Sequence, residues 1–311
     1  MLFRSIGKPL RFIFAMFIYI MYSNYFKKCS YNEIFYTVIA ALSVHLLTVY
    51  AETINPALKP IVYSFLDEYK EDTLAASFRA FGLCASFDEA GLILCVLVVL
   101  FGIAYRKTNT ILFFVFELLA FVGCFMVGRT AMLLSSLLIL LDLFGIFIKH
   151  KVISIFVVIP ILAYIGYHGF VYAMDIIEAT NMRDSYSESS ANLLTGRMLY
   201  YPDSLFGWLF GTGKDAEASD IGYIKLLHQV GIIGSLFIFH MYYLTNRHLR
   251  KYHQLNPKAY YFMTMFVLML FFYNYKGLFL YARGINDLYF LLYFILLRKL
   301  SYENNQIRRV L

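Results

Sequence analysis

Six basic residues stand in loops or near the ends of apolar segments, where together they could bind an anion. Arginine presents a planar fork that binds two phosphate oxygens and stays charged. Arg129 occupies the short turn Gly128-Arg129-Thr130, which has no structural need of an arginine. Any single member is also explained by pairing with a loop acid or by reaching lipid headgroups. The six are Arg79, Arg129, Arg197, Lys225, Lys276 and Arg283.

His228 is a candidate proton acceptor near one of these cations. It follows Lys225 by three residues, so a helix places both side chains on one face. A neutral imidazole can accept a proton from a substrate hydroxyl. On spacing alone, a histidine that packs between helices is the simpler interpretation.

The segment from Gly211 to Tyr223 combines glycines with a predicted helix start. Its first part reads Gly211-Thr-Gly213-Lys214, and Ser219 or Asp220 then fits the N-cap of an apolar segment over 221–245. A helix N-terminus attracts anions through its free amides and its dipole. The glycine pair is a weak signal, and a simple turn explains it equally well.

Four ionisable residues lie inside apolar segments, where such groups favour a functional interpretation. His45 and Glu52 are seven residues apart and share one helix face. Glu117 and Asp142 each lie about a dozen residues from Arg129, which predicts similar depths on adjacent antiparallel helices. They form either a proton-sharing pair or a structural polar contact.

Several common catalytic motifs are absent from the sequence. It contains no P-loop, no His-Glu-x-x-His, no Gly-x-Ser-x-Gly and no Asp-x-Asp. The four cysteines form no Cys-x-x-Cys pair, so neither a zinc site nor a disulfide framework is predicted. We therefore expect neither a metal nor another cofactor.

The elements that must position these residues are apolar helices. Of 311 residues, 60% are hydrophobic and 15% are charged, with a mean hydropathy of +0.64. Soluble domains contain roughly 25% charged residues, so the composition excludes a soluble enzyme. We predict an all-α, polytopic integral membrane protein that forms a single domain over 1–311. About eight spans are expected, near 34–54, 91–105, 110–128, 130–148, 152–173, 221–245, 259–280 and 284–298.

Basic residues in every second loop between the predicted spans predict the orientation of the protein in the membrane. Such clusters stay on the cytoplasmic side of the membrane, which predicts that both termini are cytoplasmic. The net charge of +7 is explained by this topology and does not indicate nucleic-acid binding. The loops 55–90 and 174–220 then face outward; they are acid-rich, with six acids against three bases and eight against three. The stretch 10–26 is flanked by bases on both sides, so it is interpreted as an interfacial segment, with a ninth span as the alternative.

The order of short motifs across 75–245 resembles O-antigen polymerases of the Wzy type, within the O-antigen ligase and polymerase superfamily. Arg79-x-x-Gly82 before Phe87-Asp88-Glu89 is similar to the family's entry to a span. Gly128-Arg129-Thr130 resembles its short turn, and Thr195-Gly196-Arg197 resembles its Ser-Gly-Arg. The last similarity is carried by Gly211-x-Gly213, by Ser219-Asp220-x-Gly222-Tyr223 and by Gly231-Ile-Ile-Gly234.

This resemblance implies a glycosyltransferase at the periplasmic face of the bacterial inner membrane, with the two outer loops as its site. Its substrates would be oligosaccharides on undecaprenyl diphosphate, and its pathway partners a flippase and a chain-length regulator. Arg79, Arg129 and Arg197 would stabilise the diphosphate leaving group without a metal. The implied candidate bases are Asp88, Glu89, Asp220 and His228.

Two alternatives stay open. An O-antigen ligase would transfer the same glycan to lipid A-core, but the loop before Asp220 lacks a histidine-rich stretch. A transporter of the same lipid would favour paired broken helices in two related halves. Among the six prolines, only Pro160 interrupts a predicted span.

Overall fold

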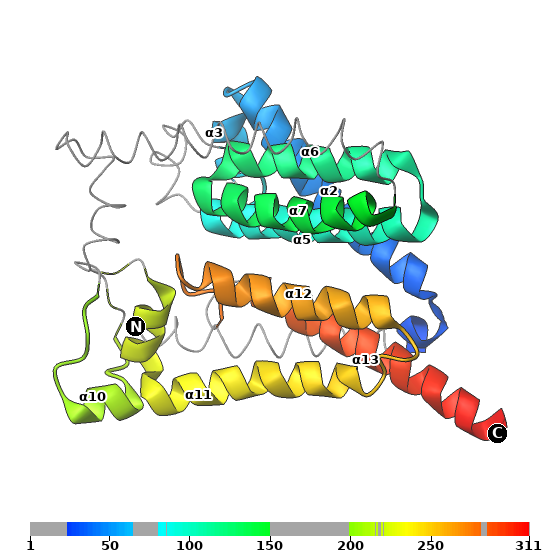
Figure 1. Cartoon of the computed structure of the whole chain (residues 1–311). Coiled ribbons are helices and arrows are strands. Elements are labelled where there is room, and N and C mark those ends of the chain that lie inside the picture. The colour runs from blue at the N-terminus through cyan, green and yellow to red at the C-terminus, as the bar shows by residue number, and fades with distance from the viewer. Residues whose placement is uncertain are drawn as a thin grey trace.

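The computed structural model describes residues 24–64, 80–84, 86–149, 199–214, 216, 219, 221–280 and 285–310. Within these ranges the regular secondary structure is helical, and there is no strand. The predicted stretch 152–173 and residues 10–23 of the stretch 10–26 lie outside the described residues. The helices, shown in Figure 1, are α2 Tyr31–Ile54, α3 Leu58–Tyr63, α5 Phe87–Thr108, α6 Ile111–Val127, α7 Arg129–Lys149, α10 Leu205–Phe210, α11 Gly222–Arg250, α12 Pro257–Tyr273 and α13 Ile285–Val310.

Helix α5 is the centre of the described bundle. It contacts α2, α6, α7 and α12, and α12 in turn packs on α11 and α13. Figure 1 shows α5, α6 and α7 side by side above α11, α12 and α13, with α2 crossing behind them. Every residue from Leu94 to Val98 is fully buried, as expected for a helix that is apolar all round.

Three helices are long and apolar enough to cross a membrane by length and composition: α2, the Asp88–Thr108 part of α5, and α11. A helix of 24 residues such as α2 is roughly 36 Å long, which exceeds the roughly 30 Å of a bilayer's hydrocarbon core. Shorter apolar helices cover Ile111–Val127, Thr130–Asp142 and Pro257–Tyr273. The count of about eight spans stays a prediction.

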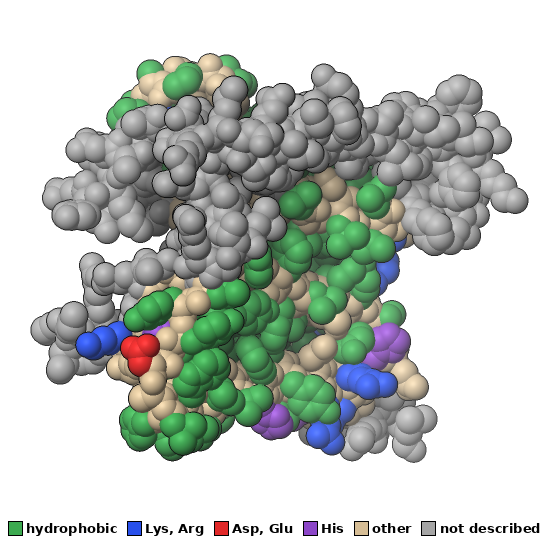
Figure 2. Space-filling model, turned by 60° about the vertical axis from the view of Figure 1, so that its left-hand side comes forward, with side chains coloured by type: hydrophobic (Ala, Val, Ile, Leu, Met, Phe, Trp, Pro, Cys, Tyr) green, Lys and Arg blue, Asp and Glu red, His purple; other side chains and the backbone are tan. Residues whose placement is uncertain are grey.

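Large apolar side chains are exposed along one face of α6. They recur at helical spacing and comprise Ile111, Leu112, Val115, Leu119 and Val122. The space-filling view in Figure 2 shows hydrophobic side chains, in green, over much of the described surface on that face of the molecule. Extended apolar surface of this kind is costly in water and suits a lipid environment.

The ends of two predicted segments differ from the sequence-based expectation. The segment predicted over 259–280 is helical only to Tyr273, because the buried Asn274 accepts the backbone amides of Phe279 and Leu280 at 3.0 and 3.1 Å and stabilises a turn. The segment predicted to end at 298 continues to Val310. Its extension is polar, so hydropathy alone underestimated the helix.

Basic residues from several loops and helix ends lie at one end of the bundle, which we call the basic end. The ammonium group of Lys299 donates to the carbonyl of Lys27 at 3.1 Å, and Tyr31 donates to Glu303 at 2.8 Å. Lys107 at the end of α5 and Lys258 at the start of α12 line one cleft. The starts of α5, α7 and α11 lie at the opposite end, which we call the site end.

Candidate functional site

Close backbone approaches hold the site end together. A Cβ on Gly91 of α5 would lie 2.7 Å from the Ala131 side chain of α7 and 2.8 Å from the Tyr273 hydroxyl of α12. A Cβ on Gly222, the first residue of α11, would collide with the carbonyl groups of Asn274 and Gly277. The start of α11 therefore packs directly on the turn that follows α12.

The loop after Arg79 is anchored to α2 by a buried carboxylate. The backbone amides of Phe81 and Gly82 donate to the same Glu52 oxygen, Oε2, at 2.9 and 3.0 Å, and Glu52 is fully buried. Ala80 donates its amide to the carbonyl of Met126 at the end of α6, at 3.2 Å. One carboxylate thus holds the loop beside the turn that leads into α7.

His45 supports the same loop one step further along. Leu83 donates its amide to His45 Nδ1 at 3.1 Å, so this ring is neutral and carries its proton on Nε2. A Cβ on Gly82, whose φ is +56°, would lie 2.6 Å from that ring. The sequence indicated that His45 and Glu52 share a face, and the structure shows that both bind one loop.

Lys59 is a charged residue that the sequence analysis missed. It lies on α3 and is only 4% exposed. Burial lowers the pKa of Lys59, and the nearby Glu52 carboxylate opposes this shift. A lone lysine between two predicted spans gives no sequence signal for burial or for a position near Glu52.

Asp88 and Glu89, two candidate bases, stand in the first turn of α5. Ser86 caps this helix by accepting the amide of Glu89 at 3.2 Å. Acids in a first turn are stabilised by the helix dipole. Their position therefore has a structural explanation that does not require catalysis.

Arg129 and Lys225 are cations at helix starts, where the helix dipole disfavours positive charge. Arg129 is the first residue of α7, and Lys225 lies in the first turn of α11. Neither first turn contains an acid. A cation near a helix N-terminus opposes the dipole, so helix stability does not explain either residue.

The predicted N-cap of α11 is wrong. The cap residue is Ile221, whose side chain makes no cap hydrogen bond. Ser219 instead accepts the amide of Ile221 at 3.1 Å and is fully buried. Serine hydroxyls form such local turns as readily as caps, which spacing alone does not distinguish.

His228 is engaged with the loop before α11. Its Nε2 lies 2.9 Å from the carbonyl oxygen of Tyr200, and the two rings stack with centroids 5.5 Å apart. A carbonyl accepts, so Nε2 carries the proton and Nδ1 is the nitrogen left to act as a base. The packing role expected from spacing is therefore present.

The glycine motifs of the loop and of α11 meet each other. Gly231 has a φ of +67° and interrupts α11, and a Cβ there would collide with Gly211 and Leu209. Thr212 donates its amide to the carbonyl of His228 at 2.6 Å. Gly211 thus serves close backbone packing on α11 rather than forming an isolated turn.

Of the remaining predicted site residues, the structure describes Lys276. Lys276 lies in the turn after α12, where its amide donates to the carbonyl of Tyr273 at 2.8 Å. This turn contacts the start of α11, so Lys276 and Lys225 share the site end. The predicted residues outside the described ranges are Arg79, Arg197, Asp220 and Arg283.

Glu117 and Asp142 come together far from the site end. A Cβ on Gly102 would contact carboxylate atoms of both. Asp142 also forms an ion pair with Arg106 at the basic end of α5, a partner that the sequence analysis did not assign. The pair is therefore part of a polar cluster with a cation.

Among the described residues, no group of histidine, cysteine, aspartate and glutamate is arranged to hold a metal ion. Comparisons with family models, curated proteins and solved structures find no significant match to this chain.

Proposed function

We propose that this protein is a polymerase of bacterial surface polysaccharide that uses oligosaccharides linked to undecaprenyl diphosphate at the periplasmic face of the inner membrane. An acceptor hydroxyl attacks the anomeric carbon of the donor glycan. A new glycosidic bond forms while the bond from that carbon to the phosphate oxygen breaks. The proton passes to a base, and undecaprenyl diphosphate leaves with its electron pair.

The observation that carries this proposal is the electrostatic asymmetry of the site end. Helices α7 and α11 start there with a cation and without an acid in the first turn. Two helix N-termini without an acid in the first turn, together with the charges of Arg129 and Lys225, favour an anion such as a diphosphate. Such preorganised charge stabilises a leaving group as negative charge develops on it.

The anchored loop supports the same proposal. Glu52 fixes the amides of Phe81 and Gly82, so the loop that begins after Arg79 is held against the bundle. In the proposal, Arg79 and Arg197 join Arg129 at the diphosphate. The candidate bases in this proposal are His228, through Nδ1, and Asp220.

The test is the glycan ladder of a strain in which the gene is deleted. A polymerase deletion loses long chains and keeps lipid A-core capped with one repeat unit, and the wild-type gene restores the ladder. Loss of every repeat unit would instead indicate a ligase or a transporter. Purified protein in lipid nanodiscs should also lengthen lipid-diphosphate-linked repeat units and release undecaprenyl diphosphate.

A further inference from the structure

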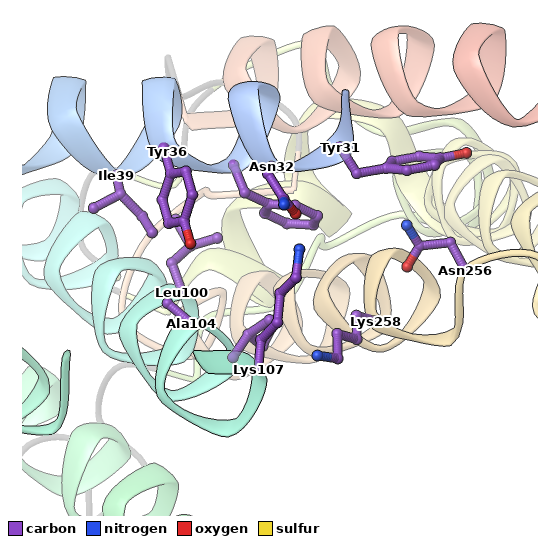
Figure 3. Close-up of a pocket in the computed structure, with 11 residues that line it drawn as sticks. Tyr31, Asn32, Tyr36, Ile39, Leu100, Ala104, Lys107, Asn256 and Lys258 are labelled. Atoms are coloured by element: carbon purple, nitrogen blue, oxygen red, sulfur yellow. The ribbon is translucent and has the colours of Figure 1, made fainter. Parts of the chain in front are cut away.

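An open cleft lies between α2, α5 and the start of α12, at the basic end of the bundle. In Figure 3, Lys107 extends from α5 toward Asn32 of α2, and Lys258 lies at the start of α12. Tyr36 points from α2 toward α5 in the same view. A second hollow adjoins the cleft and shares Lys258 with it.

Positive charge is concentrated along this cleft. Arg106 lines the adjoining hollow and lies over the Tyr261 ring, 5.2 Å from its centroid. Arg106 and Lys107 are close enough to Lys258 that their charges repel its ammonium group. No acid lines either hollow in the described part of the chain. Asp142 pairs with Arg106, while Lys107 and Lys258 have no ion-pair partner among the described residues.

The position of Lys258 is not explained by helix stability. Lys107 stands in the last turn of α5, where a cation compensates the helix dipole. Lys258 instead follows Pro257 at the start of α12, where the same dipole disfavours a cation. An anion bound between the two lysines would remove both the repulsion and the unfavourable dipole interaction.

The remaining walls of the cleft fit a lipid. Its inner side is apolar, with Phe35, Ile39, Leu100 and Ile103, and tyrosines such as Tyr31 and Tyr36 are typical of the membrane–water interface. Basic pockets between transmembrane helices on the cytoplasmic side bind anionic headgroups. By loop charge, the basic end is the cytoplasmic one.

We propose that this cleft binds the phosphate headgroup of an anionic phospholipid from the cytoplasmic leaflet, between Lys107 and Lys258, with acyl chains along the apolar walls. The site lies at the opposite end of the bundle from the proposed diphosphate site. It depends on the membrane location of the chain and does not depend on the polymerase reaction.

The test is native mass spectrometry of the full-length, delipidated protein in detergent, titrated with phosphatidylglycerol, cardiolipin and phosphatidylcholine. Both anionic lipids should bind at least about tenfold more tightly than phosphatidylcholine. Combined Lys107→Ala and Lys258→Ala substitutions should weaken this binding roughly thirtyfold, because each basic residue near an anionic surface contributes a factor of about five. The corresponding double substitution to Arg should retain binding.

A matched control removes the same charge from the same end. Arg250 and Lys251 are exposed at the end of α11, and their double substitution to Ala should leave lipid affinity within about twofold. Equal affinity of the Lys107 and Lys258 double variant and the wild type would overturn the proposal. So would equal loss in the control, equal binding of phosphatidylcholine, or displacement of the lipid by inorganic phosphate at equal concentration, which would indicate a site for free phosphate.

Discussion

Arg129 shows how one residue can separate structural from functional explanations. It begins α7, where its charge opposes the helix dipole. Asp88 and Glu89 begin α5 and are stabilised by the same effect. Position within the helix therefore strengthens the functional interpretation of Arg129 and weakens that of the two acids.

We expect Arg129→Ala to abolish long glycan chains and Arg129→Lys to restore them poorly. Loss of one charge-assisted donor to a developing anion costs on the order of 3–4 kcal/mol, or roughly a hundred- to a thousandfold in rate, and lysine lacks the planar fork. Arg79 and Arg197 should behave alike. Chain length and membrane protein level are measured together, with Arg250→Ala at the opposite, exposed end as control. Normal chains in two of the three Ala variants would contradict the diphosphate role.

Metal dependence is a second test of the arginine chemistry. If cationic side chains stabilise the leaving group, the proposed polymerase activity of the purified protein should survive treatment with EDTA. Polymerisation would be followed on lipid-diphosphate-linked repeat units, with and without added Mg²⁺ or Mn²⁺. A strict requirement for added metal would show that a Lewis acid carries the charge instead.

Glu52 is expected to stabilise the loop after Arg79. Glu52→Ala leaves the buried amides of Phe81 and Gly82 without their acceptor, and we expect a loss of about 2–4 kcal/mol in the free energy of unfolding. Glu52→Gln keeps an oxygen acceptor and should lose less. Thermal unfolding in detergent measures both, and an unchanged midpoint for Glu52→Ala would show that the loop does not depend on this carboxylate.

At the scale of elements, the break in α11 is what joins the helix to the preceding loop. The helix is interrupted at Gly231, and the carbonyl of His228 accepts the backbone amide and the hydroxyl of Thr212, at 2.6 and 3.1 Å. The glycine motif on each side permits this approach. Loop position and helix geometry are therefore coupled at this point.

Two glycines of the loop form a matched pair for testing this coupling. Gly211 and Gly213 both have positive φ, at +78° and +68°, but a Cβ on Gly211 would lie 2.7 Å from the Gln229 backbone, whereas a Cβ on Gly213 meets nothing within 4 Å. Gly213→Ala should cost only the backbone penalty of about 1–2 kcal/mol. Gly211→Ala should cost roughly 1–3 kcal/mol more and shorten the glycan chains. Equal unfolding midpoints and equal chain lengths in the two variants would argue against the close packing.

At the scale of the whole molecule, the bundle has a basic end and a site end. The basic end includes Lys107, Lys258 and Lys299. The site end includes the anchored loop and the starts of α7 and α11. The charge rule for membrane proteins assigns the basic end to the cytoplasm. We therefore expect only the site end to be accessible to reagents added outside the cell.

Cysteine labelling tests this orientation with little background, because the four native cysteines are at most 8% exposed. Ala57→Cys and Lys214→Cys lie at exposed positions of the loops predicted to face outward and should react with an impermeant thiol reagent in intact spheroplasts. Gln254→Cys, exposed between α11 and α12, should react only after the cells are lysed. Labelling of position 254 from outside would reverse the orientation and move the proposed site to the cytoplasm.

The sequence by itself determined the helical class and the position of most described helices. Continuous apolar runs bounded by basic residues specify helices because hydropathy and charge act locally along the chain. The short turn at Gly128 was also predicted within a residue, since α6 ends at Val127 and α7 begins at Arg129.

Only the tertiary structure decided how the candidate residues are used. Glu52 holds the amides of Phe81 and Gly82, 29 and 30 residues away, and Gly211 packs on the break at Gly231. Such partners depend on how helices pack, because a hydrogen bond or a close backbone approach between distant segments leaves no periodic signal in the sequence. The same reason explains why the predicted cap of α11 was wrong and why Lys107 and Lys258, 151 positions apart in the sequence, were not predicted to share a cleft.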